Sequence, residues 1–340
     1  MENKFIVGID VSKLVLDAVL ILTHEKDNVH HIQVSNDSKG LSDLLKWLKK
    51  FKEFDLSSTI FCMEHTGLYN YQLLTFLTHH ECRIWLENPV QIKKSLGIQR
   101  GKNDKIDAKR IAMFALKNLD QAKLWQPARD EINKIKHLTA LRERLVESKK
   151  RLMVPIDEFK QCGDKAMARM LEKSMSHAIK GIEKDIEQTE KKIKEVIDSD
   201  DHLKKLFTLV NSVVGVGFVS AVNLLIYTNE FTMFDDSRSF ACYCGIAPFE
   251  HSSGSSVRGR TRVSHMANKK MKTLLHLASL TAVRFDAELR QYYERKIEEG
   301  KNKMSILNAI RNKLVHRIFA VVKRGVVYVK KNIENDLVLS

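Results

Sequence analysis

The sequence predicts a mixed α/β sheet near the amino terminus, then long helices, then a mostly helical carboxyl-terminal part. Apolar runs rich in branched residues at 5–9 and 15–22 flank a short polar turn, which predicts a β-hairpin. Short apolar runs then alternate with helical spacing up to about residue 120, which is typical of a sheet covered by helices. From about 130 to 206, apolar residues recur every three or four positions among lysines and glutamates, which indicates long helices.

The individual elements follow from the local spacing of apolar residues. Besides the hairpin, we expect strands at 32–34, 59–63 and 83–86 and helices at 41–51, 69–79 and 106–116. Two long helices joined near 155–165 would form an antiparallel coiled-coil hairpin or pack across a dimer. These patterns divide the chain into domains at 1–125, 126–205 and 206–340.

The charge balance indicates a polyanionic partner. Lys and Arg number 57 against 42 Asp and Glu, which gives a formal net charge of +15 over 340 residues. Such a surplus costs self-repulsion, so we expect it to face nucleic acid. The five cysteines lack zinc or redox spacing, which favours reduced thiols in a cytoplasmic protein. The longest apolar run, 213–227, is too short to cross a bilayer, so no membrane partner is expected.

Four acidic residues are the candidate catalytic groups. Asp10 and Glu64 end predicted strands, and Asp104 and Asp107 lie three apart at the start of a predicted helix, on one face. Clustered carboxylates repel one another unless a hard divalent cation lies between them. Two such ions can activate the attacking oxygen and stabilise the leaving oxygen of a phosphodiester. Each acid also has a structural explanation, as a turn residue, a helix cap or a lone surface charge.

The order of these acids resembles a known family. Gly8-Ile-Asp10-Val-Ser-Lys13, Met63-Glu64-His65-Thr66-Gly67 and Asn103-Asp104-Lys-Ile-Asp107-Ala-Lys109 are similar to the motifs of the RNA-guided DEDD transposases of bacterial insertion sequences. The resemblance implies a RuvC-like, ribonuclease-H-like α/β domain, a coiled-coil middle and a second catalytic domain. It also implies that Asp10, Glu64, Asp104 and Asp107 bind Mg²⁺, as a pair of ions, and that the partners are DNA and a guide RNA.

A serine cluster in the carboxyl-terminal part carries the second half of the resemblance. In His251-Ser252-Ser253-Gly254-Ser255-Ser256, the family's proposed nucleophile corresponds to Ser253, with Ser252 as the alternative. A serine hydroxyl needs activation, which the carboxylate site of the same or another subunit would supply. Without the family, four serines around one glycine are typical of a flexible loop. The chain departs from the family where Ala267 and Asn268 replace a Lys-Arg-Gly segment, which leaves the DNA contacts there open.

The region after the serines is strongly basic. No acidic residue occurs between His251 and Phe285, and a purely solvated basic face is the alternative to phosphate binding. The candidate nucleic-acid-binding residues are Arg258, Arg260, Arg262, Lys269, Lys270 and Lys272. The glycines in 213–222 either bring backbone amides to a phosphate, as in a helix-hairpin-helix, or simply join two helices.

These features favour a transposase that excises and inserts DNA as a homo-oligomer, a dimer or a tetramer. A hydrolytic junction resolvase would use the same acids without the serine. An actin-like sugar kinase would share only the motif Gly8-Ile-Asp10-Val-Ser12, and a non-catalytic nucleic-acid-binding protein would need none of the acids.

Overall fold

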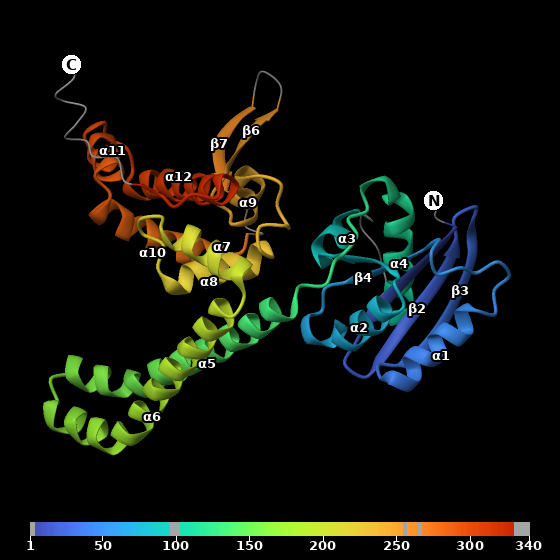
Figure 1. Cartoon of the computed structure of the whole chain (residues 1–340), viewed down its shortest axis with the longest axis horizontal. Helices are drawn as coiled ribbons and strands as arrows, with labels where there is room; N and C mark the ends of the chain where they lie inside the picture. The colour runs from blue at the N-terminus through green and yellow to red at the C-terminus, as the bar shows by residue number, and fades with distance from the viewer. Residues whose placement is uncertain (1–3, 96–102, 254–256, 264–266, 330–340) are drawn as a thin grey trace. The chain divides into compact units, whose positions relative to one another are not determined.

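The computed structural model describes residues 4–95, 103–253, 257–263 and 267–329 (Figure 1). The chain divides into two compact units, Met1–Pro127 and Ala128–Ser340. In the described residues no helix is long and apolar enough to cross a membrane.

The first unit is built on a five-stranded mixed sheet. Its strands are β1 (Phe5–Val11), β2 (Val15–Leu22), β3 (Glu25–Ser35), β4 (Thr59–Glu64) and β5 (Arg83–Glu87). They lie in the order β3-β2-β1-β4-β5, with β1, β2 and β3 antiparallel and β1, β4 and β5 parallel. This topology is ribonuclease-H-like, so the predicted fold class is confirmed. The predicted third strand is correct in place but much too short, because the charged and histidine-rich start of β3 has little apolar signal.

Helices cover both faces of this sheet. They are α1 (Ser38–Leu48), α2 (Tyr71–His79), α3 (Pro89–Ser95) and α4 (Asp104–Lys117), with 3-10 turns at Gly67–Asn70 and Leu119–Gln121. Apolar residues of α1 and α2 share one cluster with Phe5, Val7 and Ile9, whereas those of α4 share another with Ile6. Because side chains alternate along a strand, α4 lies on the face opposite α1 and α2. Sequence reasoning missed α3, which begins at a proline, a residue suited to a first helical position.

Two long helices begin the second unit. α5 (Asp130–Gln161) and α6 (Lys165–Asp198) run antiparallel, because later residues of α5 pair with earlier residues of α6 (Figure 1). Arg142 bonds Glu190 and Lys149 bonds Glu183, each at 2.6 Å. The expected junction near 155–165 is wrong in its first part, since Pro155 lies inside α5 and the helices meet only at 162–164. Packing along α6 keeps the helix continuous past the missing proline N–H.

The rest of the second unit is mostly helical, as expected. It contains α7 (Asp201–Asn211), α8 (Phe218–Thr228), α9 (Ser237–Tyr243), α10 (Lys269–Phe285), α11 (Ala287–Glu298) and α12 (Lys303–Arg324), with a hairpin of β6 (Pro248–Ser253) and β7 (Val257–Val263). The glycines predicted at a helix connection do join α7 to α8. A Cβ on Gly215, whose φ is +96°, would overlap the carbonyl oxygen of Ala278 in α10. Gly215 therefore allows close helix packing, which supports the structural alternative for this turn.

Candidate active site

The first unit brings two of the candidate acids to one end of its sheet. β1 and β4 are parallel neighbours, with Gly8 opposite Cys62 and Ile9 opposite Met63. Asp10 follows Ile9, and Glu64 follows Met63 as the last residue of β4. Both side chains are half-buried. The register therefore places Asp10 and Glu64 side by side at the carboxyl ends of adjacent strands.

Helix α4 contributes the other two acids. Asp104 and Asp107 lie in its first turn, and Asn103 caps the helix by accepting a hydrogen bond from Lys105 N at 3.1 Å. Because Asn103 is the N-cap of α4, Asp104 does not have the structural role of a capping residue. α4 packs directly on β1, because a Cβ on Gly8 would lie 2.6 Å from the carbonyl oxygen of Ala108. That contact lies next to Asp107 in α4 and two residues before Asp10 in β1.

The four carboxylates influence one another electrostatically. Burial, then the negative charges of Asp104, Asp107, Glu64 and Asp17, raise the pKa of Asp10 to about 6 from 3.8. Burial and the charge of Asp107 also raise the pKa of Glu64. A raised carboxyl pKa means that the ionised form is disfavoured, and a cation would relieve this cost.

The donor chemistry suits a hard divalent cation, but the ligands are not assembled. Within the described residues, no three His, Cys, Asp or Glu side chains are placed to hold a metal ion. One reason is that Asp107 Oδ1 accepts a 2.5 Å bond from Arg110 Nη1. Metal binding therefore requires side chains to move. The carboxylates of Asp10 and Glu64 can do so without breaking a hydrogen bond to a described residue. No described residue donates a hydrogen bond to either side chain.

The serine cluster lies on the β6–β7 hairpin of the second unit. Ser253 is the last residue of β6 and pairs with Val257, and Ser252 pairs with Arg258. Gly254, Ser255 and Ser256 are outside the described residues. Arg258, Arg260 and Arg262 belong to β7, so the start of the basic run and the candidate nucleophile share one hairpin. The carboxylates belong to the first unit and the serines to the second.

The lysines of the basic run lie at the start of α10 and differ in their surroundings. Lys269 is exposed. Lys270, by contrast, forms an ion pair with Glu143 of α5, and its Nζ lies 5.5 Å from the centre of the Tyr227 ring. Sequence reasoning treated these lysines alike because the partners of Lys270 are distant in the chain.

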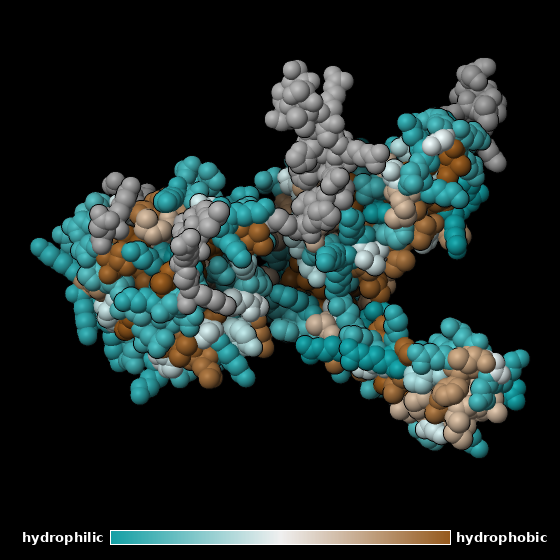
Figure 2. All heavy atoms as spheres, turned by 180° about the vertical axis from the view of Figure 1, so that it is seen from behind, coloured by the Kyte–Doolittle hydropathy of each residue, from teal (hydrophilic) through white to brown (hydrophobic). Residues whose placement is uncertain are grey.

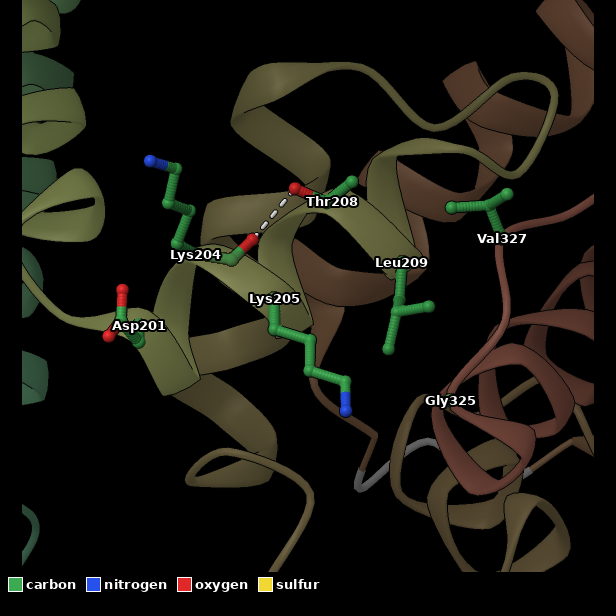
Figure 3. A pocket seen from close by; sticks show the side chains of 7 residues that line it. All are labelled: Asp201, Lys204, Lys205, Thr208, Leu209, Gly325 and Val327. Atoms are coloured by element: carbon green, nitrogen blue, oxygen red, sulfur yellow. Dashed lines mark hydrogen bonds between the residues drawn. The ribbon is translucent and has the colours of Figure 1, made fainter.

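A hollow in the second unit offers a different basic surface. It has a volume of about 330 Å³ and is lined by α7 and the segment after α12 (Figure 3). The side chains of Lys204 and Lys205 point in different directions in Figure 3, and Thr208 bonds only the carbonyl oxygen of Lys204, at 2.8 Å. The two ammonium groups do not converge on a common point, so this hollow is not a built anion site.

Two family models match parts of the chain. Residues 7–159 match a DEDD transposase model of the IS110 type, described as "Transposase". Residues 207–294 match the model "Transposase IS116/IS110/IS902 family". The two matches together span most of the chain.

Individual relatives match different lengths of the chain. The "Pilin gene-inverting protein" of Moraxella lacunata is 26% identical over 95% of this chain and 97% of its own. The insertion element IS110 43.6 kDa protein of Streptomyces coelicolor is 28% identical over 36% of this chain and 30% of its own. Among solved structures, RuvC of T. thermophilus with a Holliday junction substrate is 13% identical, at a TM-score of 0.27, over 36% of this chain and 99% of that one. From the two family matches, the chain belongs to the IS116/IS110/IS902 family of transposases and is an enzyme of DNA recombination.

Proposed function

We propose that this transposase cleaves and rejoins DNA at a divalent-cation site formed by Asp10, Glu64, Asp104 and Asp107. The observation that carries the proposal is the position of Asp10 and Glu64 at the carboxyl ends of adjacent strands, where burial and then the charges of the neighbouring acids raise the pKa of Asp10 to about 6. Mg²⁺, as a pair of ions, is the cation we assign, because all the ligands offered are carboxylate oxygens. Cations bound there would stabilise the charge that develops on the attacking and leaving oxygens of a phosphodiester.

Ser253 is the proposed nucleophile. Its hydroxyl oxygen would attack phosphorus, forming a phosphoserine ester, while the serine proton ends on the deoxyribose hydroxyl that leaves. Attack by a deoxyribose hydroxyl of the strand to be joined reverses the step and restores the serine. The ester conserves the phosphodiester energy. Gene inversion, named for the Moraxella relative, needs rejoining as well as cutting. The arginines of β7 supply phosphate contacts next to this serine in the chain.

The proposal includes a guide RNA and a homo-oligomer, a dimer or a tetramer. The guide RNA follows from the resemblance to RNA-guided transposases, and a formal net charge of +15 attracts nucleic acid of either kind. Figure 2 shows hydrophobic side chains gathered at the end of the α5–α6 hairpin, where Val154, Phe159 and Met170 are 43%, 37% and 55% exposed. We assign this surface to a second copy of the chain, because the carboxylates and the serine belong to separate units.

The test is strand exchange by the full chain on element-end DNA with Mg²⁺ and co-purified RNA. A denaturing gel should reveal a covalent protein–DNA adduct that EDTA, Asp10→Asn and Ser253→Ala each abolish. Ser252→Ala is the matched control and should retain the adduct.

Cleavage that survives Ser253→Ala without any adduct would show hydrolysis by water, as in a resolvase. Adduct formation that survives both EDTA and Asp10→Asn would overturn the cation site. Ribonuclease treatment should abolish site-specific exchange if RNA guides it, and light scattering of the DNA complex should give more than one copy.

A further inference from the structure

Two further carboxylates extend the row formed by Asp10 and Glu64. Asp17 of β2 is the register partner of Asp10, and Glu87 of β5 is the register partner of Glu64. Val19, two residues after Asp17, belongs to the cluster that α4 covers, so Asp17 shares its face of the sheet with Ile6, Gly8 and Asp10. Four neighbouring strands thus carry one acid each at the same level, beneath α4.

The outer acids differ from the inner ones in their hydrogen bonds. Asp17 is only 3% exposed, and both its oxygens are occupied. Oδ1 accepts from His31 Nε2 at 2.7 Å, and Oδ2 accepts from Gln33 Nε2 at 3.0 Å. Both donors come from β3. Asp10, by contrast, receives no hydrogen bond from any described side chain.

This difference has an electrostatic consequence. Like charges directly opposite on adjacent strands destabilise a sheet, and an exposed pair relieves the repulsion by turning apart. Asp17 cannot turn, because His31 and Gln33 hold both of its oxygens. Its carboxylate is therefore held in a fixed position beside Asp10, where it adds to the repulsion from the other acids, and a bound cation would relieve that repulsion. A fixed charge of this kind favours the cation-bound state without any reorganisation.

We propose that Asp17, held by His31 and Gln33, is a positioning residue that strengthens cation binding at Asp10 without being a ligand itself. This inference rests on the proposed cation site, and it concerns affinity for the ion rather than the chemical step. The sequence contained a signal, since Asp17 is an acid within the otherwise apolar run Val15–Leu22.

The test is Mn²⁺ binding to the full chain without DNA, measured from the free-ion signal in electron paramagnetic resonance. Asp17→Asn keeps the shape and removes the charge; its oxygen can still accept from His31, and its NH2 group can donate to the Gln33 amide once that amide is turned over. At a cross-strand spacing of about 5 Å in a solvent-accessible site, its loss should weaken Mn²⁺ affinity roughly tenfold. Asp43→Asn removes one charge from α1, on the opposite face of the sheet, and should leave the affinity unchanged.

A second variant and a stability measurement separate positioning from structure. Gln33 is exposed, so Gln33→Ala should fold normally, yet it frees one oxygen of Asp17 and should weaken Mn²⁺ binding two- to threefold, a modest electrostatic effect at this distance. Normal Mn²⁺ affinity in Asp17→Asn and Gln33→Ala, with only a lower melting temperature, would overturn the inference.

Asp10→Asn distinguishes this failure from that of the proposed function. If Asp10→Asn loses Mn²⁺ binding while Asp17→Asn binds Mn²⁺ normally, Asp17 has no part in the site, but the proposed cation site itself is supported. Normal Mn²⁺ binding in Asp10→Asn would contradict both the proposed cation site and the role of Asp17.

Discussion

Gly8 of β1 and Ala112 of α4 are in such close contact that no side chain fits between them. A Cβ on Gly8 would lie 2.6 Å from the carbonyl oxygen of Ala108 and closer still to the backbone nitrogen of Ala112. This contact determines how closely the start of α4, with Asp104 and Asp107, can approach the strand that carries Asp10. The missing side chain of one glycine therefore sets the spacing of the carboxylates.

Gly8→Ala is expected to push α4 away from the sheet. Backbone atoms cannot rotate away as a flexible side chain can, so the free energy of unfolding should fall by about 3 kcal/mol. Divalent-cation affinity should fall with it, because the acids of α4 withdraw from Asp10. Urea unfolding and Mn²⁺ titration measure the two effects.

Gly181→Ala in α6 is the control for this substitution, since nothing lies within 4 Å of its Cβ position. It should stabilise the protein by about 0.5–1 kcal/mol through helix propensity. Equal effects of the two substitutions would contradict the close-contact explanation.

The raised pKa of Asp10 predicts how stability depends on pH. The folded pKa is about 6 against 3.8 for the ordinary group, so the folded protein binds the proton more tightly than the unfolded chain does. The stability that this group contributes is complete below pH 3.8 and is lost as the pH rises through about 6. At pH 8 without metal, Asp10→Asn should therefore be more stable than the native protein by about 1–2 kcal/mol, allowing for screening at a half-buried group.

Urea unfolding in EDTA at pH 4 and pH 8 measures this difference, which should shrink toward zero at pH 4. Mg²⁺ at pH 8 should stabilise the native protein and leave Asp10→Asn unchanged. An advantage of Asp10→Asn that is as large at pH 4 as at pH 8 would show that charge repulsion is not its cause.

The sequence predicted those parts of the site that depend on local pattern. The apolar spacing of the strands and of α4 is clear, and the acids lie where it predicts them: Asp10 and Glu64 near the carboxyl ends of β1 and β4, and the two aspartates of α4 in its first turn. Contacts between distant segments left no such pattern. The bond of His31 to Asp17 and the ion pair of Glu143 with Lys270 depend on tertiary packing. Pro155 misled the helix boundary because its local preference is overridden by packing against α6.

Two lysines of the basic run should have different roles: Lys269 should bind DNA, whereas Lys270 should mainly stabilise the fold. Lys269 is exposed at the start of α10, so Lys269→Ala should weaken DNA binding and reduce the salt dependence by about one counterion. Lys270 is already paired with Glu143 and lies over Tyr227. Lys270→Ala should therefore lower the melting temperature and change the salt slope less. Titrations of DNA binding against salt, with thermal melts of each variant, measure both effects. Identical salt slopes and melting temperatures for the two variants would contradict this division.

Arg129 joins separate segments of the second unit, and its loss should destabilise the fold. Its guanidinium donates to Glu230 at 2.6 and 3.0 Å and to Asp200, the cap of α7, at 2.9 and 3.0 Å. These bonds lower the pKa of Asp200 to about 2. Glu230 is 8% exposed, so Arg129→Ala leaves a buried carboxylate without its main partner.

The cost should be about 2–3 kcal/mol of unfolding free energy, below the full value for a buried pair because Arg129 is itself partly exposed. Arg151→Ala breaks an exposed pair with Glu147 within α5 and should cost less than about 0.5 kcal/mol. Adding Glu230→Gln to Arg129→Ala should recover part of the loss, since the stranded charge is then gone. Urea unfolding of the native protein and the three variants measures these effects. Without any recovery in the double variant, the loss would have to come from packing of the Arg129 side chain rather than from the charge of Glu230.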